Sequence, residues 1–558
     1  MISRDDISSI LRRIDGRGYK SYSELRGASE SVDGVHLKVT KVQGDPFAPP
    51  SVVEISTVLR DGWRVDIEPI PLADLIHRQL SKTLPRSSMR GVGEGKSGVL
   101  AVPTPSPIMI PRSAVEARPL GGGGWRILAR VWVGLPARRR RVLGREALEL
   151  LTSRLVKGFR DALRDLDARR VAEHARAWVE QEFLRGLLRR EGLVAFVGDG
   201  SILPRKCGGC WEPLEGAVPF ESPPSLRLEV ELPTGRLVSG MVVRRGVTTI
   251  AGPAFHGKTT LAEAISWGVW NHIPGDGREL VVSDSDLVYV ESENGRWVSC
   301  VDVSPFINYL PGGVDVRCFT TRDASGATSI AASIQEFAEA GASGFVIDED
   351  ETATNMIHRD VWAEEVTGKR TINPLSDMSS ELAKSGLSIV IVASGALPLL
   401  ASSSEIVVMD EFRARDASFK RRDAESALEN IGYRRVSKRY ERPAERLVAK
   451  PLHLEKPRVK GFVAEARGLR DRVDLRPLKQ VAEEQQLSTS VRVAAVIASR
   501  RRAPIARLAR EFSQRLWSWD YSFLAQTPGP DISYVRHYEI LYVLNRLPGL
   551  EACHTGYC

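Results

Sequence analysis

A glycine-rich loop lies near the middle of the chain, between a β-rich run at residues 247–250 and apolar residues with helical spacing at 261–269. It contains Gly252, four further residues and then Gly257-Lys258-Thr259. Glycines let the backbone curl so that successive N–H groups point at phosphate oxygens, at the positive end of the following helix. A strand, loop and helix in this order predict an α/β domain that binds ATP or GTP.

The polar groups of this loop have separate expected roles. Lys258 would reach the β- and γ-phosphates, and the Thr259 hydroxyl would hold Mg²⁺. Nucleotide contacts are expected along the whole loop, from Gly252, Pro253, Ala254, Phe255, His256, Gly257, Lys258, Thr259 and Thr260. The alternative is a chance glycine-rich turn, which the flanking strand-like and helix-like runs disfavour.

Residues 90–97 end in a second Gly-Lys-Ser but lack the rest of the pattern. Arg90 stands where the first glycine belongs, and residues 97–103 read as a strand and not as a helix. Without a helix N-terminus the anion site is incomplete. The segment is interpreted as a flexible turn, and an accessory phosphate or nucleic-acid contact is the alternative.

An apolar run at residues 342–347 ends in the carboxylates Asp348, Glu349 and Asp350. This is the sequence form of a buried strand that delivers an acid to Mg²⁺. Asp348 suits the metal shell, and Glu349 is placed as the catalytic residue that polarises an attacking water. The alternative is a strand that ends in a solvated acidic turn.

A loop of small residues, 323–329, precedes a helix-like run that is expected to begin at Ile330. It would place backbone N–H groups and hydroxyls at a second helix N-terminus, about 20 residues before Asp348. Ser325 and Gly326 are therefore candidates for a further phosphate contact. Ser-Gly loops also cap helices for structural reasons alone, so the position of this loop carries the prediction.

The 558 residues exceed what one hydrophobic core supports and indicate about two to four domains. The formal net charge is +8. A basic, arginine-rich surface suits polyanions, but the charge is modest for this length, and genome composition or heat adaptation explains the arginines equally well.

No apolar stretch approaches the roughly 20 residues that cross a bilayer, and the first residues form no signal sequence. A cytoplasmic protein without membrane contact is expected.

The six cysteines are too few for a disulfide scaffold. Cys207 and Cys210 have the spacing of a zinc knuckle, and the tail with Cys553 and Cys558 could supply further ligands. Zinc binding and an intracellular disulfide of the kind found in hyperthermophiles are both open. Inert thiols are the favoured interpretation.

The chain resembles a known family over nearly its whole length. Matching segments lie in order at residues 14–20, 42–51, 192–197, 199–205, 271–279, 323–329 and 348–355, among them Val-Gln-Gly-Asp-Pro-Phe-Ala-Pro-Pro-Ser at 42–51. They are similar to the predicted ATPases of the ABC class, a soluble group distinct from the transporters. The resemblance implies that residues 252–260 are Walker A, 325–329 the signature loop, Asp348 and Glu349 Walker B with its catalytic acid, and 352–355 the D-loop.

The resemblance also implies a domain organisation and an assembly. The expected domains are a family-specific mixed α/β N-terminal domain at 1–214, an ABC-type P-loop ATPase core at 215–415, and a small basic, helical C-terminal domain at 416–558. In this class a nucleotide is held between Walker A of one core and the signature loop of another. One chain has one of each, so a head-to-tail homodimer that encloses two ATP molecules is implied.

Two departures from the family pattern affect the expected activity. After the strand at 387–392, ABC ATPases place a switch histidine, whereas this chain has Ala393, Ser394 and Gly395. Ser394 can hydrogen-bond a phosphate but cannot supply an imidazole. No glutamine is assigned to the Q-loop. Hydrolysis is therefore expected to be slow, with ATP acting in part as a clamp for the dimer.

The hypothesis for the moved cargo is nucleic acid, with RNA preferred. Its candidate contacts are the basic runs at residues 138–141, 434–440 and 500–502, although such runs are more often solvated faces. The alternative from another class is a nucleotide-gated protein-binding switch with slow or no hydrolysis. A small-molecule phosphotransferase also fits a P-loop, but the signature loop and Glu349 argue against it.

Overall fold

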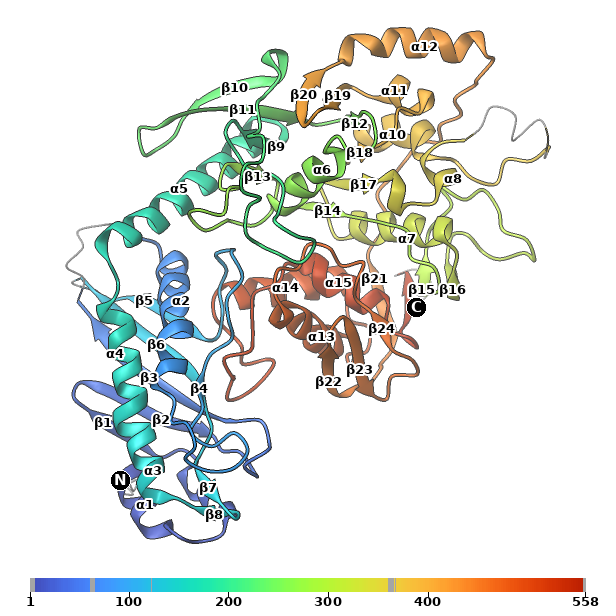
Figure 1. The fold of residues 1–558 in the computed structure, drawn as a ribbon. Helices are drawn as coiled ribbons and strands as arrows, with labels where there is room; N and C mark the ends of the chain where they lie inside the picture. The colour runs from blue at the N-terminus through green and yellow to red at the C-terminus, as the bar shows by residue number, and fades with distance from the viewer. Residues whose placement is uncertain (1–5, 61–65, 122, 360–365, 367, 555–558) are drawn as a thin grey trace. The chain divides into compact units, whose positions relative to one another are not determined.

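The computed structural model describes residues 6–60, 66–121, 123–359, 366 and 368–554. The chain forms two compact units (Figure 1). The first is Met1–Trp178 with Gln514–Tyr534, and the second is Val179–Ser513 with Val535–Cys558. Each unit therefore combines segments that are far apart in the sequence.

An antiparallel sheet organises the first unit, in the order β1-β2-β3-β6-β4, with β5 also paired to β6. The alternating Val, His, Leu, Lys and Val of β2 (Val35–Lys41) bury every second side chain, as a sheet with one face in the core requires. The core joins this face to α2 (Pro69–Ser87) and to the helices that follow the sheet. The other elements are α1 (Ile7–Ile14), η1 (Tyr19–Leu25), β1 (Ser29–Val32), β3 (Ser51–Leu59), β4 (Leu100–Ala101), β5 (Val115–Pro119), β6 (Trp125–Val133), β7 (Ala137–Arg138), β8 (Arg141–Val142), α3 (Gly144–Leu148), η2 (Glu149–Leu155) and α4 (Val156–Arg164).

A segment near the end of the chain completes the first unit. The Ser113 backbone N–H donates to the Ile532 carbonyl at 2.8 Å, and the Ser113 hydroxyl donates to the Gly529 carbonyl at 2.7 Å. Trp519 packs against the core of this unit. Residues 514–534 thus pack against and hydrogen-bond to the first unit, at residues that lie some 400 positions earlier in the sequence.

A six-stranded sheet carries the second unit, in the order β14-β17-β18-β12-β19-β20 (Figure 1). All strand pairs are parallel except the edge pair β19 and β20. Its strands are β12 (Val247–Ala251), β14 (Leu287–Tyr289), β17 (Gly344–Asp348), β18 (Ser388–Val392), β19 (Glu405–Asp410) and β20 (Arg413–Asp416). Every residue of β12, β17 and β18 is buried, as expected for parallel strands covered on both faces.

The second unit also contains smaller sheets, among them the four-stranded sheet β10-β11-β9-β13. The strands are β9 (Leu193–Gly198), β10 (Arg227–Glu231), β11 (Leu237–Arg244), β13 (Val281–Ser283), β15 (Arg296–Val301), β16 (Phe319–Ala324), β21 (Arg446–Lys450), β22 (Glu455–Lys460), β23 (Val463–Arg467), β24 (Val473–Asp474) and β25 (Glu551–His554). The helices are η3 (Pro224–Leu226), α6 (Lys258–Trp267), α7 (Gly326–Glu339), η4 (Glu349–Glu351), α8 (Thr354–Ile357), α10 (Leu375–Lys384), α11 (Leu397–Ser402), η5 (Ser418–Lys420), α12 (Arg421–Asn430), α13 (Glu484–Ala498) and α15 (His537–Asn545). By residue number, α5 (Ala168–Glu191) and α14 (Ile505–Trp517) each belong in part to both units.

The strands expected at residues 247–250, 342–347 and 387–392 are confirmed as β12, β17 and β18. The turn at 90–97 is also confirmed, since a short strand and no helix follows it. The helix expected to begin at Ile330 begins four residues earlier, at Gly326. It can start there because Ser325 caps it, accepting a hydrogen bond from the Thr328 backbone N–H.

The prediction of inert thiols is wrong for four cysteines. Cys207 and Cys210 form one disulfide, and Cys300 and Cys318 form another. The second joins β15 to the segment just before β16. The alternative that involved Cys558 lies outside the described residues. Within the described ranges, no group of three or more His, Cys, Asp or Glu residues is arranged to hold a metal ion.

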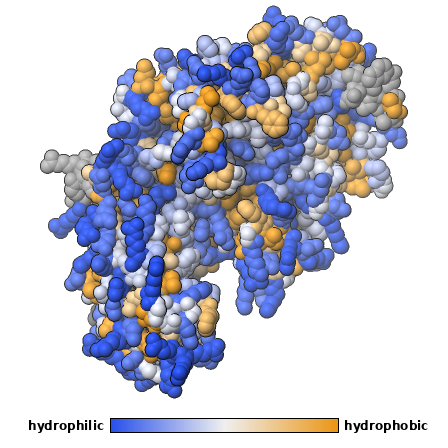
Figure 2. Space-filling model, in the orientation of Figure 1, coloured by the Kyte–Doolittle hydropathy of each residue, from blue (hydrophilic) through white to orange (hydrophobic). Residues whose placement is uncertain are grey.

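On the face drawn in Figure 2, hydrophilic side chains predominate and hydrophobic ones form smaller patches. Among the helices of the described residues, none combines the length and the apolar character that a membrane crossing needs.

Candidate functional site

The glycine-rich loop connects the buried end of β12 to the first turn of α6, as its sequence predicts. Gly252 and Gly257 have φ angles of +136° and +93°, which side chains rarely adopt. A Cβ on Gly252 would lie 2.2 Å from the Met409 carbonyl oxygen. The loop therefore requires glycine at 252 both for its backbone conformation and for its close approach to β19.

The sheet order brings the acidic strand to this loop. Strand β18 lies between β12 and β17, so the three parallel strands present their carboxyl ends at one edge. There the Thr259 hydroxyl donates to Asp348 Oδ2 at 2.8 Å. Burial raises the pKa of Asp348. A hydroxyl and a carboxylate at this distance are oxygen donors of the kind that Mg²⁺ prefers.

A cavity of about 450 Å³ opens at this edge of the sheet. Its lining residues are Ala254, Phe255, Gly257, Lys258, Thr259, Thr260, Asp348, Glu349, Asp350, Val392, Ala393, Ser394 and Phe412. Gly252, Pro253 and His256 belong to the same loop without lining this cavity. The Lys258 ammonium donates to the Pro253 carbonyl at 2.8 Å, so its positive charge stays at the loop.

Glu349, the residue after Asp348, has three contacts on its carboxylate. The Ser394 backbone N–H and hydroxyl both donate to Oε2, at 2.8 and 2.9 Å. The His358 Nε2 lies 3.4 Å from Oε1. The contact with His358, supported by the Ser394 hydrogen bonds, lowers the pKa of Glu349 to about 2. The carboxylate is therefore ionised and fixed in orientation at neutral pH.

His358 is a residue that the sequence interpretation missed. The family pattern directs attention to the end of β18, where this chain has Ser394 and no histidine. The structure instead places an imidazole beside Glu349 from the end of α8. His358 reaches Glu349 only because η4 and α8 turn the chain back toward the carboxylate, and no local sequence motif predicts this turn.

A second, mainly apolar cavity of about 280 Å³ adjoins the loop and shares Gly257, Thr260 and Phe412 with the first. Leu203, Pro204, Leu214, Gly216, Ala217, Val218, Phe220 and Met409 form the rest of its lining. The adjoining segment between Arg205 and Pro213 is a closed loop: these two residues form an isolated β-bridge, and the Cys207–Cys210 disulfide lies inside the loop. This cavity offers apolar contact beside a phosphate-binding loop.

The structure does not bring the small-residue loop to this cavity within one chain. Ser325 and Gly326 stand at the N-terminus of α7, and neither lines the phosphate cavity. Their neighbours are the turn before β15 and the start of the D-loop segment. The Ser292 hydroxyl donates to the Gly326 carbonyl at 3.1 Å and accepts from the Ala353 N–H at 2.8 Å.

Two loop residues have surroundings that the pattern did not predict. The His256 Nδ1 accepts a hydrogen bond from the Glu411 backbone N–H at 2.9 Å, which ties the loop to the turn after β19. Phe255 has φ of +68° and is 95 % exposed. An apolar ring this exposed at a phosphate cavity is available to a second molecule.

A strand, glycine-rich loop and helix, with an acidic residue at the end of a nearby parallel strand, define a P-loop nucleotide-binding protein. The chain belongs to the ATPases of the ABC class. The P-loop domain of this family matches residues 167–446, and its N-terminal domain matches residues 4–166. The chain is also 29 % identical, over 255 residues and 44 % of its length, to an uncharacterized protein of Methanocaldococcus jannaschii, and spans 56 % of that relative.

Proposed function

We propose that this chain binds ATP with Mg²⁺ and hydrolyses it between two copies of itself. The observation that carries the proposal is the 2.8 Å contact of Thr259 with Asp348, beside a fixed Glu349 carboxylate, in a cavity of about 450 Å³. Thr259 and Asp348 would hold the metal, which would neutralise charge on the phosphates. Lys258 would exchange its contact with the Pro253 carbonyl for phosphate oxygens.

Glu349 is the proposed catalytic residue. Its ionised carboxylate would orient a water for attack on the γ-phosphorus, in line with the bridging oxygen, whose bond to the γ-phosphorus breaks as ADP leaves. Ser394 and His358 would keep the carboxylate from rotating away. Ser394 thus supports the catalytic carboxylate, where the sequence suggested a direct phosphate contact.

The apolar cavity beside the loop is the proposed place for the nucleotide base. It shares Gly257, Thr260 and Phe412 with the phosphate cavity, so one ligand can occupy both. Its volume of about 280 Å³ and its apolar lining suit a planar ring.

The proposed active assembly is a head-to-tail homodimer in which Ser325 and Gly326 of one copy face the phosphate cavity of the other. This is supported by the absence of both residues from the lining of the cavity in their own chain. Phe255 supports it as well, because association would cover its exposed ring. Closure on ATP and opening after hydrolysis would move the attached domains in the cytoplasm.

Nucleic acid, with RNA preferred, is the proposed cargo. In the described structure, residues 139 and 140 lie at a hairpin tip with positive φ angles and are exposed. The run at 434–440 is less suited to base stacking than its sequence suggests, because Tyr440 is buried and donates to Gln335 Oε1. The exposed arginines of these runs would contact phosphates.

The test measures ATP hydrolysis and solution mass together for the wild type and Glu349→Gln, with ATP and Mg²⁺, with and without RNA. Hydrolysis by the wild type, a loss of about 10²-fold or more in the variant, and an ATP-dependent dimer of the variant are expected. ATP-dependent dimers of both proteins without hydrolysis would favour the protein-binding switch. Inactive monomers in both cases would refute the proposed function.

A further inference from the structure

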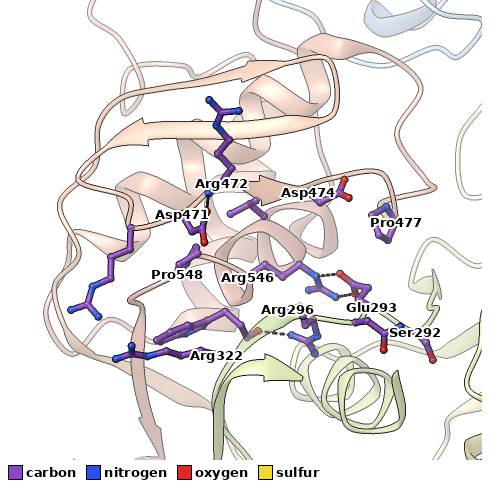
Figure 3. Close-up of a pocket in the computed structure, with 15 residues that line it drawn as sticks. Ser292, Glu293, Arg296, Arg322, Asp471, Arg472, Asp474, Pro477, Arg546 and Pro548 are labelled. Carbon is purple, nitrogen blue, oxygen red and sulfur yellow. Dashed lines mark hydrogen bonds and ion pairs between the residues drawn. The ribbon is translucent and has the colours of Figure 1, made fainter. Parts of the chain in front are cut away.

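A second polar pocket lies in the same unit, away from the phosphate cavity. Its volume is about 490 Å³. Its lining comes from residues 292–297 at the start of β15 with Arg322 of β16, from residues 470–474 leading into β24 together with Pro477, and from residues 546 and 548 after α15 (Figure 3). None of these residues lines the phosphate cavity. We refer to it as the arginine pocket.

Five arginines line the arginine pocket, namely Arg296, Arg322, Arg470, Arg472 and Arg546. Two of them are neutralised at its base. Arg546 donates to both carboxylate oxygens of Glu293, as Figure 3 shows, and Arg296 pairs with Glu336 at 3.1 Å. These buried pairs form a rigid floor for the pocket.

The arginines of the rim are not neutralised in this way. The side chains of Arg322 and Arg470 are exposed and form no hydrogen bond or ion pair with the residues that the structure describes. The guanidinium of Arg472 lies 3.9 Å from its nearest acidic partner, Glu465. Of the acids in the lining, Glu293 is paired with Arg546 and Asp474 is held by Arg476. Asp471, which accepts a hydrogen bond from the Arg472 backbone N–H, leaves one carboxylate against the three arginines of the rim. The rim therefore carries an excess of positive charge without a partner.

An aromatic ring completes the lining. Trp297 is half-buried, and its indole N–H donates to the Leu550 carbonyl at 3.0 Å, which fixes the ring. A fixed indole offers a flat face for stacking, and guanidinium groups bind phosphate oxygens through paired N–H donors. The volume lies within the range for small-ligand sites. Together these groups match a ligand that has both a planar base and a phosphate.

The pocket is also connected to the signature loop. The Gly295 N–H donates to the Ala324 carbonyl at 2.8 Å, and the Glu293 N–H donates to the Ser329 hydroxyl at 2.8 Å. The Ser292 hydroxyl donates to Gly326. A ligand that orders residues 292–297 therefore acts on both ends of the loop that contains Ser325.

We infer that the arginine pocket binds a nucleotide phosphate, either of a free mononucleotide or of a single-stranded RNA, and that its occupancy changes ATP turnover through the signature loop. Arg322 and Arg470 contact the phosphate, and Trp297 stacks on the base. The binding step is independent of the proposed ATPase. The effect on turnover rests on the proposed function.

The test compares the full chain with the double variant Arg322→Ala/Arg470→Ala. The control is Arg421→Ala/Arg422→Ala, which removes two exposed arginines of α12 in the same unit. The probes are uridine monophosphate and a fluorescent octauridylate, which carry no triphosphate for the P-loop. Binding is measured by fluorescence anisotropy, with the monophosphate as competitor, and thermal melting verifies the fold of each variant.

The expected result is binding by the wild type and the control, and a loss of about tenfold or more in affinity for the double variant. Competition by millimolar monophosphate identifies a free nucleotide as the ligand, and octauridylate binding that resists competition identifies a strand. Absence of binding to both probes in the wild type, or equal binding by the double variant, overturns the proposal that the arginine pocket binds a nucleotide. If binding is lost as expected while the wild type shows no ATP hydrolysis, the pocket stands and the proposed function fails.

Discussion

At the residue scale, the neighbours of Glu349 determine which orientation its carboxylate can take. Two donors from Ser394 hold one oxygen, and His358 lies beside the other. Ser394 stands at the end of β18 and His358 at the end of α8, so two separate elements fix one side chain. A carboxylate held from both sides loses little freedom when it orients a water.

We expect His358→Ala to lower kcat for ATP by about tenfold while KM for ATP changes little, because His358 positions Glu349 and does not line the phosphate cavity. Steady-state kinetics with saturating Mg²⁺ measures both constants. His358→Gln, which keeps a donor, should recover part of the lost kcat. The exposed His453 supplies the control variant His453→Ala. A rise in KM with unchanged kcat would contradict a positioning role.

Much of the phosphate cavity could be predicted from sequence, because its parts are local motifs. The loop needs glycines at fixed spacing, and Asp348 follows an apolar run, so both were recognisable, and the structure places Thr259 beside Asp348. His358 was not recognisable. A single histidine has no pattern of its own, and its contact with Glu349 depends on how η4 and α8 turn the chain back. The catalytic and metal roles of these residues remain predictions.

At the element scale, β15 and β16 form a two-stranded ribbon that carries one wall of the arginine pocket and leads directly into α7. An isolated pair of strands is only marginally stable in water. The Cys300–Cys318 disulfide crosses this ribbon, and the buried Arg296–Glu336 pair ties it to α7. The position of Ser325 therefore depends on covalent and ionic links as well as on strand pairing.

Removal of the Cys300–Cys318 disulfide is expected to cost about 3 kcal/mol of unfolding free energy, because the closed loop spans 18 residues. Removal of Cys207–Cys210, with a separation of 3, should cost only about 2 kcal/mol by the same chain-entropy relation. Chemical denaturation of the two Cys→Ser double variants, each compared with the wild type, measures both values. An equal or reversed order would show that strain or solvation, and not loop closure, dominates.

Strand existence could be predicted, whereas strand order could not. Short apolar runs identify β17 and β18 as buried strands, but nothing in either run states that β18 lies between β12 and β17. That order depends on contacts between segments more than 130 residues apart, such as Thr249 with Ile391. Likewise, the start of α7 was misjudged because a serine cap has the same composition as an open loop.

At the scale of the whole molecule, the candidate nucleotide site belongs to one of the two compact units. All residues of the phosphate and apolar cavities lie between 203 and 412, within Val179–Ser513. The first unit has its own core, which reaches from Ile7 to Ala175. The division into domains at 1–214, 215–415 and 416–558 remains a prediction. A cytoplasmic location also remains a prediction; intracellular disulfides are common in hyperthermophiles.

Saturation with ADP and Mg²⁺ at about 100 times Kd should stabilise the nucleotide-binding unit against opening by about 2.7 kcal/mol. Hydrogen exchange followed by mass spectrometry should then show slower exchange in peptides of β12 and α6, and unchanged exchange in peptides of β3 and β6. Lys258→Ala should abolish the effect. Equal protection of both units would show that they open as one cooperative body.

Because residues 514–534 belong to the first unit, this unit cannot finish folding until late in synthesis. A ribosome releases the strands of this unit early, yet Ser113 finds its partners at Gly529 and Ile532 only after almost the whole chain has been made. The newly made first unit therefore stays unfinished while the P-loop unit is translated. A chain cut at residue 513 would keep every residue that lines the phosphate cavity, but it would lose α15 and β25 of the second unit and leave the first unit unfinished.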